Sequence, residues 1–231
     1  MKTFKILGLL LSYPTEELQS NMEDLKAVLQ REGLLASKLE KTIVKFMDQL
    51  ATKNLLKAQE DYVALFDRGR GNSLYLFEHI HGESRDRGQA MVDLIDHYQK
   101  KGLAVSTKEL PDYIPLFLEY LSMCEPKEAQ ELLGEVVHIV ATLAAKLNKK
   151  ASRYSSVFLA LEKLSHAKID VQFVQRALME DESRDDSLEA LDKEWEETPA
   201  FDGLGDKACA VCPSATKFDF GSKPTELSKV N

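Results

Sequence analysis

The sequence has few cysteines and no long apolar run. Its three cysteines, Cys124, Cys209 and Cys212, are too few and too unevenly spaced for a disulfide framework, which favours a reducing compartment. We therefore predict a cytoplasmic protein. The apolar run at residues 6–11 is shorter than a signal-peptide core and far shorter than the roughly 20 residues that cross a bilayer. We expect it to form the first helix, and we expect no stable membrane insertion.

The sequence also lacks a basic excess, because its formal net charge is −8. The segment 180–197 contains ten acidic residues against Arg184 and Lys193, so it alone accounts for the excess and the rest of the chain is neutral. Nucleic-acid binding normally needs a basic face that displaces counterions, so the charge pattern argues against a nucleic-acid partner. It permits a basic peptide as a partner.

Familiar catalytic motifs are missing too. The chain has no G-x-S-x-G, no Walker loop and no G-x-G-x-x-G. Carboxylate pairs such as Asp112 with Glu119 are common in a chain with 29% charged residues, so they do not indicate acid–base catalysis. We predict that the protein is not an enzyme and that it holds no cofactor.

Two short motifs have the spacing of metal ligands. His79 and His81 form a His-x-His pair, which needs an extended strand to place both rings on one face, whereas the context here predicts a helix or turn. We favour histidines that are hydrogen-bonded at a structured turn or recognition surface. Cys209 and Cys212 form a C-x-x-C without a second pair. A metal-dependent hydrolase that uses His79 and His81 remains an alternative.

Helical periodicity dominates the part of the chain before the acidic segment. Apolar residues recur every three or four positions, which predicts one helix between Pro14 and Gly33 and another over residues 129–147. A helix should begin between Pro111 and Pro115, because proline lacks the N–H that later turns require. We predict an all-α protein with a single helical bundle-like domain over residues 1–198. Residues 199–231 should form a flexible tail, since they contain few large apolar side chains.

The stretch 61–94 differs from ordinary helical sequence. It combines aromatics, the His-x-His pair and four of the chain's 11 glycines. The glycines within residues 67–71 predict a charged turn, because glycine weakens a helix by about 1 kcal/mol relative to alanine. After this turn, Ser84 is placed to cap a further helix, and Arg85 and Arg87 fall in the first turn of that helix.

At these same residues the chain resembles a known family. The segments 65–70 (LFDRGR), 73–79 (SLYLFEH) and 81–94 (HGESRDRGQAMVDL) closely resemble the NarJ family, also called the respiratory nitrate reductase delta subunit. The segment 109–121 (ELPDYIPLFLEYL) is similar to the family's second signature. Residues 10–14, 183–186 and 195–197 are similar to it near the ends, so the likeness covers roughly residues 1–200. In the wider family the second signature usually reads Pro-Asp-His, and Tyr113 stands here in place of that histidine.

This resemblance implies a dedicated all-α chaperone. Members of the family bind the catalytic (alpha) subunit of respiratory nitrate reductase in the cytoplasm before its molybdenum cofactor is in place, and they delay its membrane attachment. The implied partner is the N-terminal segment of that subunit. The molybdenum cofactor synthesis machinery is a further partner that the resemblance suggests. A general helical interaction scaffold, unconnected with nitrate respiration, is a second alternative.

We expect the client segment to bind as an amphipathic helix, with its apolar side in an aromatic groove and its basic residues against carboxylates. The competing explanation for each aromatic residue is that it belongs to the core. The predicted client-binding residues are Tyr62, Phe66, Asp67, Tyr75, Phe77, Glu78, His79, His81, Asp112, Tyr113, Phe117, Glu119 and Tyr120.

Overall fold

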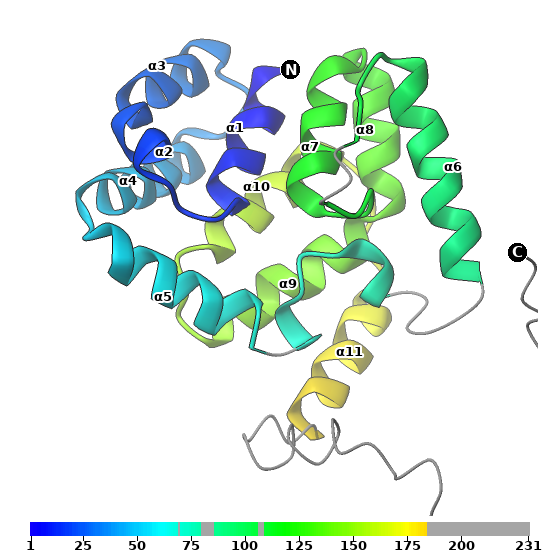
Figure 1. Ribbon diagram of the computed structural model, residues 1–231. Coiled ribbons are helices and arrows are strands. Elements are labelled where there is room, and N and C mark those ends of the chain that lie inside the picture. Colours follow the sequence, from blue (N-terminus) through cyan, green and yellow to red (C-terminus); the bar gives the residue numbers. More distant parts are fainter. Residues whose placement is uncertain (69, 80–85, 106–108, 184–231) are drawn as a thin grey trace, which may run out of the picture. The chain divides into compact units, whose positions relative to one another are not determined.

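The computed structural model describes residues 1–68, 70–79, 86–105 and 109–183, which contain eleven α-helices and two short 3₁₀ helices (Figure 1). In chain order these are α1 (Lys2–Leu11), α2 (Glu16–Ser20), α3 (Met22–Glu32), α4 (Ser37–Thr52), α5 (Leu55–Phe66), η1 (Arg70–Asn72), η2 (Leu76–His79), α6 (Asp86–Lys100), α7 (Ile114–Met123), α8 (Pro126–Glu135), α9 (Val137–Lys149), α10 (Ser155–Ser165) and α11 (Val171–Ser183). The predicted all-α class is confirmed, because the described residues hold one isolated antiparallel bridge, Tyr75 with Tyr113, and no strand.

Local sequence explains several helix ends. The Thr15 side chain caps α2 by accepting a 3.1 Å hydrogen bond from the Leu18 N–H. Gly33 ends α3 with a left-handed φ of 61°, a conformation that glycine adopts without steric cost. α7 begins at Ile114 with Pro115 in its first turn, which confirms the start predicted between the two prolines.

Two predicted helices are each divided in the structure. The helix expected between residues 14 and 33 is broken at Asn21, whose side chain donates a 2.8 Å hydrogen bond to the Glu17 carbonyl and which separates α2 from α3. The helix expected over residues 129–147 is broken at Val136, with φ −104° and ψ 7°, between α8 and α9. The apolar spacing continues across both breaks, so periodicity alone could not reveal them.

α1 lies at the centre of the core. Seven of its ten residues are buried, and it contacts α3, α7 and α10. In Figure 1, α1 lies between α3 and α7. Phe4, Leu7 and Leu10 are fully buried. The apolar run at residues 6–11 is therefore part of the first helix, as predicted, and the structure places this helix in the core. α9 and α10 form a second closely packed pair, and α10 also contacts α4 and α8.

The start of α1 is capped from a distant part of the sequence. The Glu32 carboxylate, at the end of α3, accepts hydrogen bonds from the N–H groups of Lys2 and Thr3 and from the Thr3 hydroxyl at 2.7, 2.6 and 2.5 Å. A negative charge here also favours the positive end of the helix dipole. Partial burial acts to raise the pKa of Glu32, but these hydrogen bonds outweigh it and the net pKa is lowered.

The described residues up to Ser183 belong to one compact unit. None of the described helices is both long enough and apolar enough to span a membrane. The predicted cap at Ser84, the predicted tail 199–231 and the Cys209/Cys212 pair lie outside the described residues.

Candidate functional site

A furrow runs between α1 and α7 and encloses a cavity of about 200 Å³. Leu9, Tyr113 and Leu116 supply its apolar wall, and all three side chains are half-buried. The helices approach closely because residue 8 is glycine. A Cβ atom at Gly8 would lie 3.0 Å from the Pro115 carbonyl oxygen and 3.3 Å from the Leu118 Cβ. A larger residue would therefore push α1 and α7 apart and reshape the furrow.

Charged side chains stand around this apolar wall. The Lys5 ammonium forms a 2.9 Å ion pair with the Glu119 carboxylate, and the exposed Glu109 also lines the furrow. Exposed ion pairs of this kind contribute little to stability, so they can exchange partners at low cost. The furrow thus combines an apolar surface with carboxylates that a basic partner could reach.

Backbone pairing joins the two signature segments. The Leu76 N–H donates to the Asp112 carbonyl at 3.0 Å, and the Ile114 N–H donates to the Leu74 carbonyl at 2.8 Å. These bonds lie on either side of the bridge between Tyr75 and Tyr113, whose rings are 5.4 Å apart. Segments almost forty positions apart in the sequence therefore form one continuous structure beside the furrow.

Tyr113 connects the furrow to the core. The Tyr62 hydroxyl donates to the Leu11 carbonyl at 2.9 Å, and its oxygen lies 3.2 Å from the Tyr113 hydroxyl. Since the Tyr62 proton goes to Leu11, Tyr113 is the donor in the second bond. Burial raises the pKa of Tyr113 to about 12, so its hydroxyl keeps its proton at neutral pH. Tyr113 is therefore a neutral hydrogen-bond donor at this position.

Asp112 is a buried residue that joins the two segments next to this site. Its side chain is fully buried, and one carboxylate oxygen accepts a 3.0 Å hydrogen bond from the Phe77 N–H at the start of η2. The other oxygen has no hydrogen-bond partner among the described residues. Burial raises the pKa of Asp112, and the Phe77 bond and the positive charge of Arg87 offset part of that rise. Asp112 thus holds η2 against the start of α7.

The model of the family described as "Nitrate reductase delta subunit" matches residues 16–160 of this chain. The chain belongs to the nitrate reductase delta subunit family.

Named relatives agree with this delta subunit assignment. The chain is 42% identical over 207 residues to the nitrate reductase molybdenum cofactor assembly chaperone NarJ of Escherichia coli (strain K12), covering 88% of this chain and 87% of NarJ. It is 41% identical over 197 residues to NarW of the same strain, covering 85% of this chain and 82% of NarW. A crystal structure of a candidate redox enzyme maturation protein from Archaeoglobus fulgidus is 25% identical, with a TM-score of 0.51, covering 71% of this chain and 92% of that chain.

The predicted site residues of this delta subunit family member fall into three groups. Five of them are buried against core neighbours in this conformation, so a peptide would reach them only if the residues above them moved: Tyr62, Phe66, Asp112, Phe117 and Tyr120. The remaining described residues are half-buried or exposed: Asp67, Tyr75, Phe77, Glu78, His79, Tyr113 and Glu119. His81 lies outside the described residues. Client contact stays a prediction for all of them.

His79 lies in η2, and its Nε2 is 2.9 Å from the Ser73 carbonyl oxygen. This agrees with the expected hydrogen-bonded turn. Within the described residues, no group of three histidine, cysteine, aspartate or glutamate side chains is placed to hold a metal ion. The comparisons with known proteins give no support to the hydrolase or to a general scaffold, because the family and its named relatives concern nitrate reductase.

Sequence reasoning did not select several residues that line the furrow, notably Lys5, Leu9, Glu109 and Leu116. Glu109 and Leu116 belong to the segment 109–121, whose resemblance to a family signature was already noted, so the signal was present there. Lys5 and Leu9 carried no comparable signal, because only the packing of α1 against α7 brings them to the site.

Proposed function

We propose that this chain is a nitrate reductase molybdenum cofactor assembly chaperone. It binds the catalytic subunit of respiratory nitrate reductase in the cytoplasm, assists insertion of the molybdenum cofactor and delays attachment of the subunit to the membrane. The observation that carries the proposal is the 42% identity to NarJ over 88% of the chain. The family model also supports it, since the matched residues 16–160 include both segments that carry the resemblance.

The proposed contact is between the N-terminal segment of the catalytic subunit and the furrow of α1 and α7. An amphipathic helix would place an apolar side chain against Leu9, Tyr113 and Leu116. Basic residues of the same segment would meet Glu109 and Glu119, which adds specificity and association rate more than affinity.

The size of the furrow limits how the segment binds. A cavity of about 200 Å³ accepts one or two side chains and not a whole helix. The segment would therefore insert an apolar anchor and lie across the surface on either side of it. Anchors of this kind supply most of the binding energy in many interfaces. The replacement of one wall residue should accordingly have a large effect.

Titration calorimetry with a peptide of the first residues of the cognate catalytic subunit tests this contact. We expect selective binding relative to a scrambled peptide. Leu116→Ala should weaken binding about tenfold, because it truncates the wall of an anchor pocket. Val92→Ala is the matched control, since Val92 is an exposed apolar residue on α6, outside the furrow. Equal affinities for the Leu116→Ala and Val92→Ala variants would refute the placement of the peptide.

A second experiment tests the function apart from the contact. A bacterial strain that lacks its own nitrate reductase assembly chaperones is supplied with this chain, and nitrate reduction by cell extracts is measured. Restored activity supports the chaperone function even if the peptide does not bind at the furrow. Normal expression of the soluble chain without any restored activity would argue against the function itself.

A further inference from the structure

A second and larger cavity, of about 420 Å³, lies between α4, α5 and the residues that precede α10. Its volume falls within the usual range for sites that bind small ligands. Phe46, Leu50, Ala58 and Tyr154 line it and are all buried, so they form an apolar floor. None of the residues that line this cavity lines the furrow between α1 and α7.

Two aromatic rings shape the floor. The ring centroids of Phe46 and Tyr154 are 4.8 Å apart, and the ring planes meet at 65°. Tyr154 also packs edge-to-face on Phe66, with ring centroids 5.1 Å apart, so the floor belongs to an aromatic cluster, and a further planar apolar group can pack against the surface of this cluster that lines the cavity. The floor therefore favours an aromatic ligand group over a polar one.

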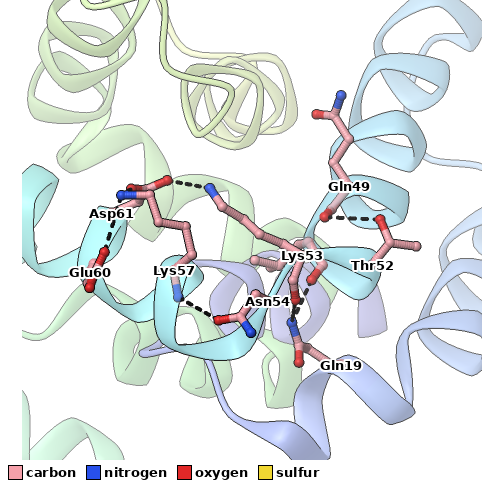
Figure 2. A network of polar contacts seen from close by, with 9 residues as sticks. Gln19, Gln49, Thr52, Lys53, Asn54, Lys57, Glu60 and Asp61 are labelled. Atoms are coloured by element: carbon pink, nitrogen blue, oxygen red, sulfur yellow. Dashed lines mark hydrogen bonds and ion pairs between the residues drawn. The ribbon is translucent and has the colours of Figure 1, made fainter.

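The rim of the cavity is polar, with Gln49, Lys53, Asp61, Ser152 and Arg153. Figure 2 shows the first three of these within a larger network around the turn between α4 and α5. Their charges decide which ligands the cavity would accept.

The network in Figure 2 is electrically balanced. Lys53 and Lys57 both pair with Asp61, and Lys57 also lies 3.2 Å from a Glu60 carboxylate oxygen. Two ammonium groups thus face two carboxylates. Lys53 and Asp61 therefore add no net charge to the rim.

Arg153 is different. It is exposed at the rim, and no carboxylate of the described part of the chain lies within ion-pair distance of its guanidinium. Arg153 also immediately precedes Tyr154 and α10, where the positive end of the helix dipole adds to its charge. Among the described residues, the rim thus carries one positive charge without an ion-pair partner beside an apolar aromatic floor.

We propose that this cavity is a ligand site for an aromatic group that carries a single negative charge. The ring system would lie on Phe46 and Tyr154, and the anionic group would pair with Arg153 and accept hydrogen bonds from Gln49 or Ser152. This site goes beyond the proposed chaperone function and does not depend on it, because its residues belong to other elements than the furrow.

A matched pair of fluorescent probes tests the proposal on the full chain. 8-Anilinonaphthalene-1-sulfonate is aromatic with one permanent negative charge, and N-phenyl-1-naphthylamine is a neutral relative. We expect Arg153→Gln and Gln49→Glu each to weaken sulfonate binding about fivefold, since each removes or opposes one favourable charge contact at the rim. Both substitutions should leave binding of the neutral probe unchanged. Arg31→Gln, at an exposed arginine of α3, is the control.

Ala58→Leu tests where the aromatic part of the ligand lies. This variant should fill the apolar floor of the cavity with its larger side chain and so weaken the binding of both probes. Its urea midpoint is measured beside the wild type, so that loss of folding is recognised. The two rim variants replace exposed side chains, so we expect both to fold, and their urea midpoints are measured in the same way. The proposal is overturned if wild type binds no sulfonate probe, if the rim variants bind it like the Arg31→Gln control, or if the neutral probe loses affinity equally.

Discussion

Replacement of Asp112 by alanine should destabilise the fold rather than only weaken a partner. The sequence places Asp112 among the predicted client-binding carboxylates, but the structure buries it completely and makes it the acceptor for the Phe77 N–H at 3.0 Å. Loss of this bond from the partly buried Phe77 N–H costs about 1–3 kcal/mol, and the space that the buried carboxylate vacates adds to this cost. We expect Asp112→Ala to lower the free energy of unfolding by about 2–3 kcal/mol.

Asp112→Asn should behave differently, because the amide keeps an acceptor for Phe77 but cannot ionise. Burial raises the pKa of Asp112 in the folded protein, so its stabilising contribution is fully present below the unfolded pKa of about 3.9. That contribution is lost as the pH rises through the folded pKa. The stability of the wild type relative to Asp112→Asn should therefore fall as the pH increases from about 4 towards neutrality.

Urea unfolding followed by far-ultraviolet circular dichroism measures both effects across this pH range. Asp112→Ala and Asp112→Asn are compared with wild type at each pH, with equal m-values as the condition for comparison. An unfolding free energy of Asp112→Ala within about 0.5 kcal/mol of wild type would refute the assigned role of the Phe77 bond. A pH-independent difference between wild type and Asp112→Asn would refute the argument from burial.

Three further predictions concern the packing around α1. Gly8→Ala should destabilise the protein by about 1–2 kcal/mol in urea unfolding, although alanine has the higher helix propensity, because the new Cβ would lie 3.0 Å from the Pro115 carbonyl oxygen. An increase in stability would show that α1 and α7 separate freely. Glu32→Gln should cost about 1 kcal/mol at neutral pH, since it weakens the cap on α1. Because the pKa of Glu32 is lowered in the folded state, the extra stability of wild type over Glu32→Gln is fully present above the unfolded pKa of about 4.3. This difference should vanish as the pH falls through the folded pKa of Glu32. A difference in melting temperature that persists in acid would contradict this prediction. Tyr62→Phe should lower the unfolding free energy by about 1–2 kcal/mol, because the buried Leu11 carbonyl loses its donor, and unchanged stability would show that this bond contributes nothing.

Local sequence determined the helical class of this protein and the start of one of its central helices. Apolar spacing and the two prolines placed the start of α7 correctly, and the short apolar run at residues 6–11 was rightly expected to be a helix. These features depend on neighbours within a few positions, which the sequence displays directly. The breaks at Asn21 and Val136 were missed because the apolar stripe continues through them.

The furrow and the role of each signature residue were decided by tertiary structure. Sequence identified the segments 65–94 and 109–121 as special, and the structure joins parts of them through Tyr75 and Tyr113. Only the packing of α1 against α7 adds Leu9 to the same site, and only the folded structure shows that Asp112 is buried. A side chain's type shows which contacts it can make, whereas its burial depends on elements far away in the sequence. The sequence could therefore predict some of the residues that belong to the site, but not which of them a partner can reach on its surface.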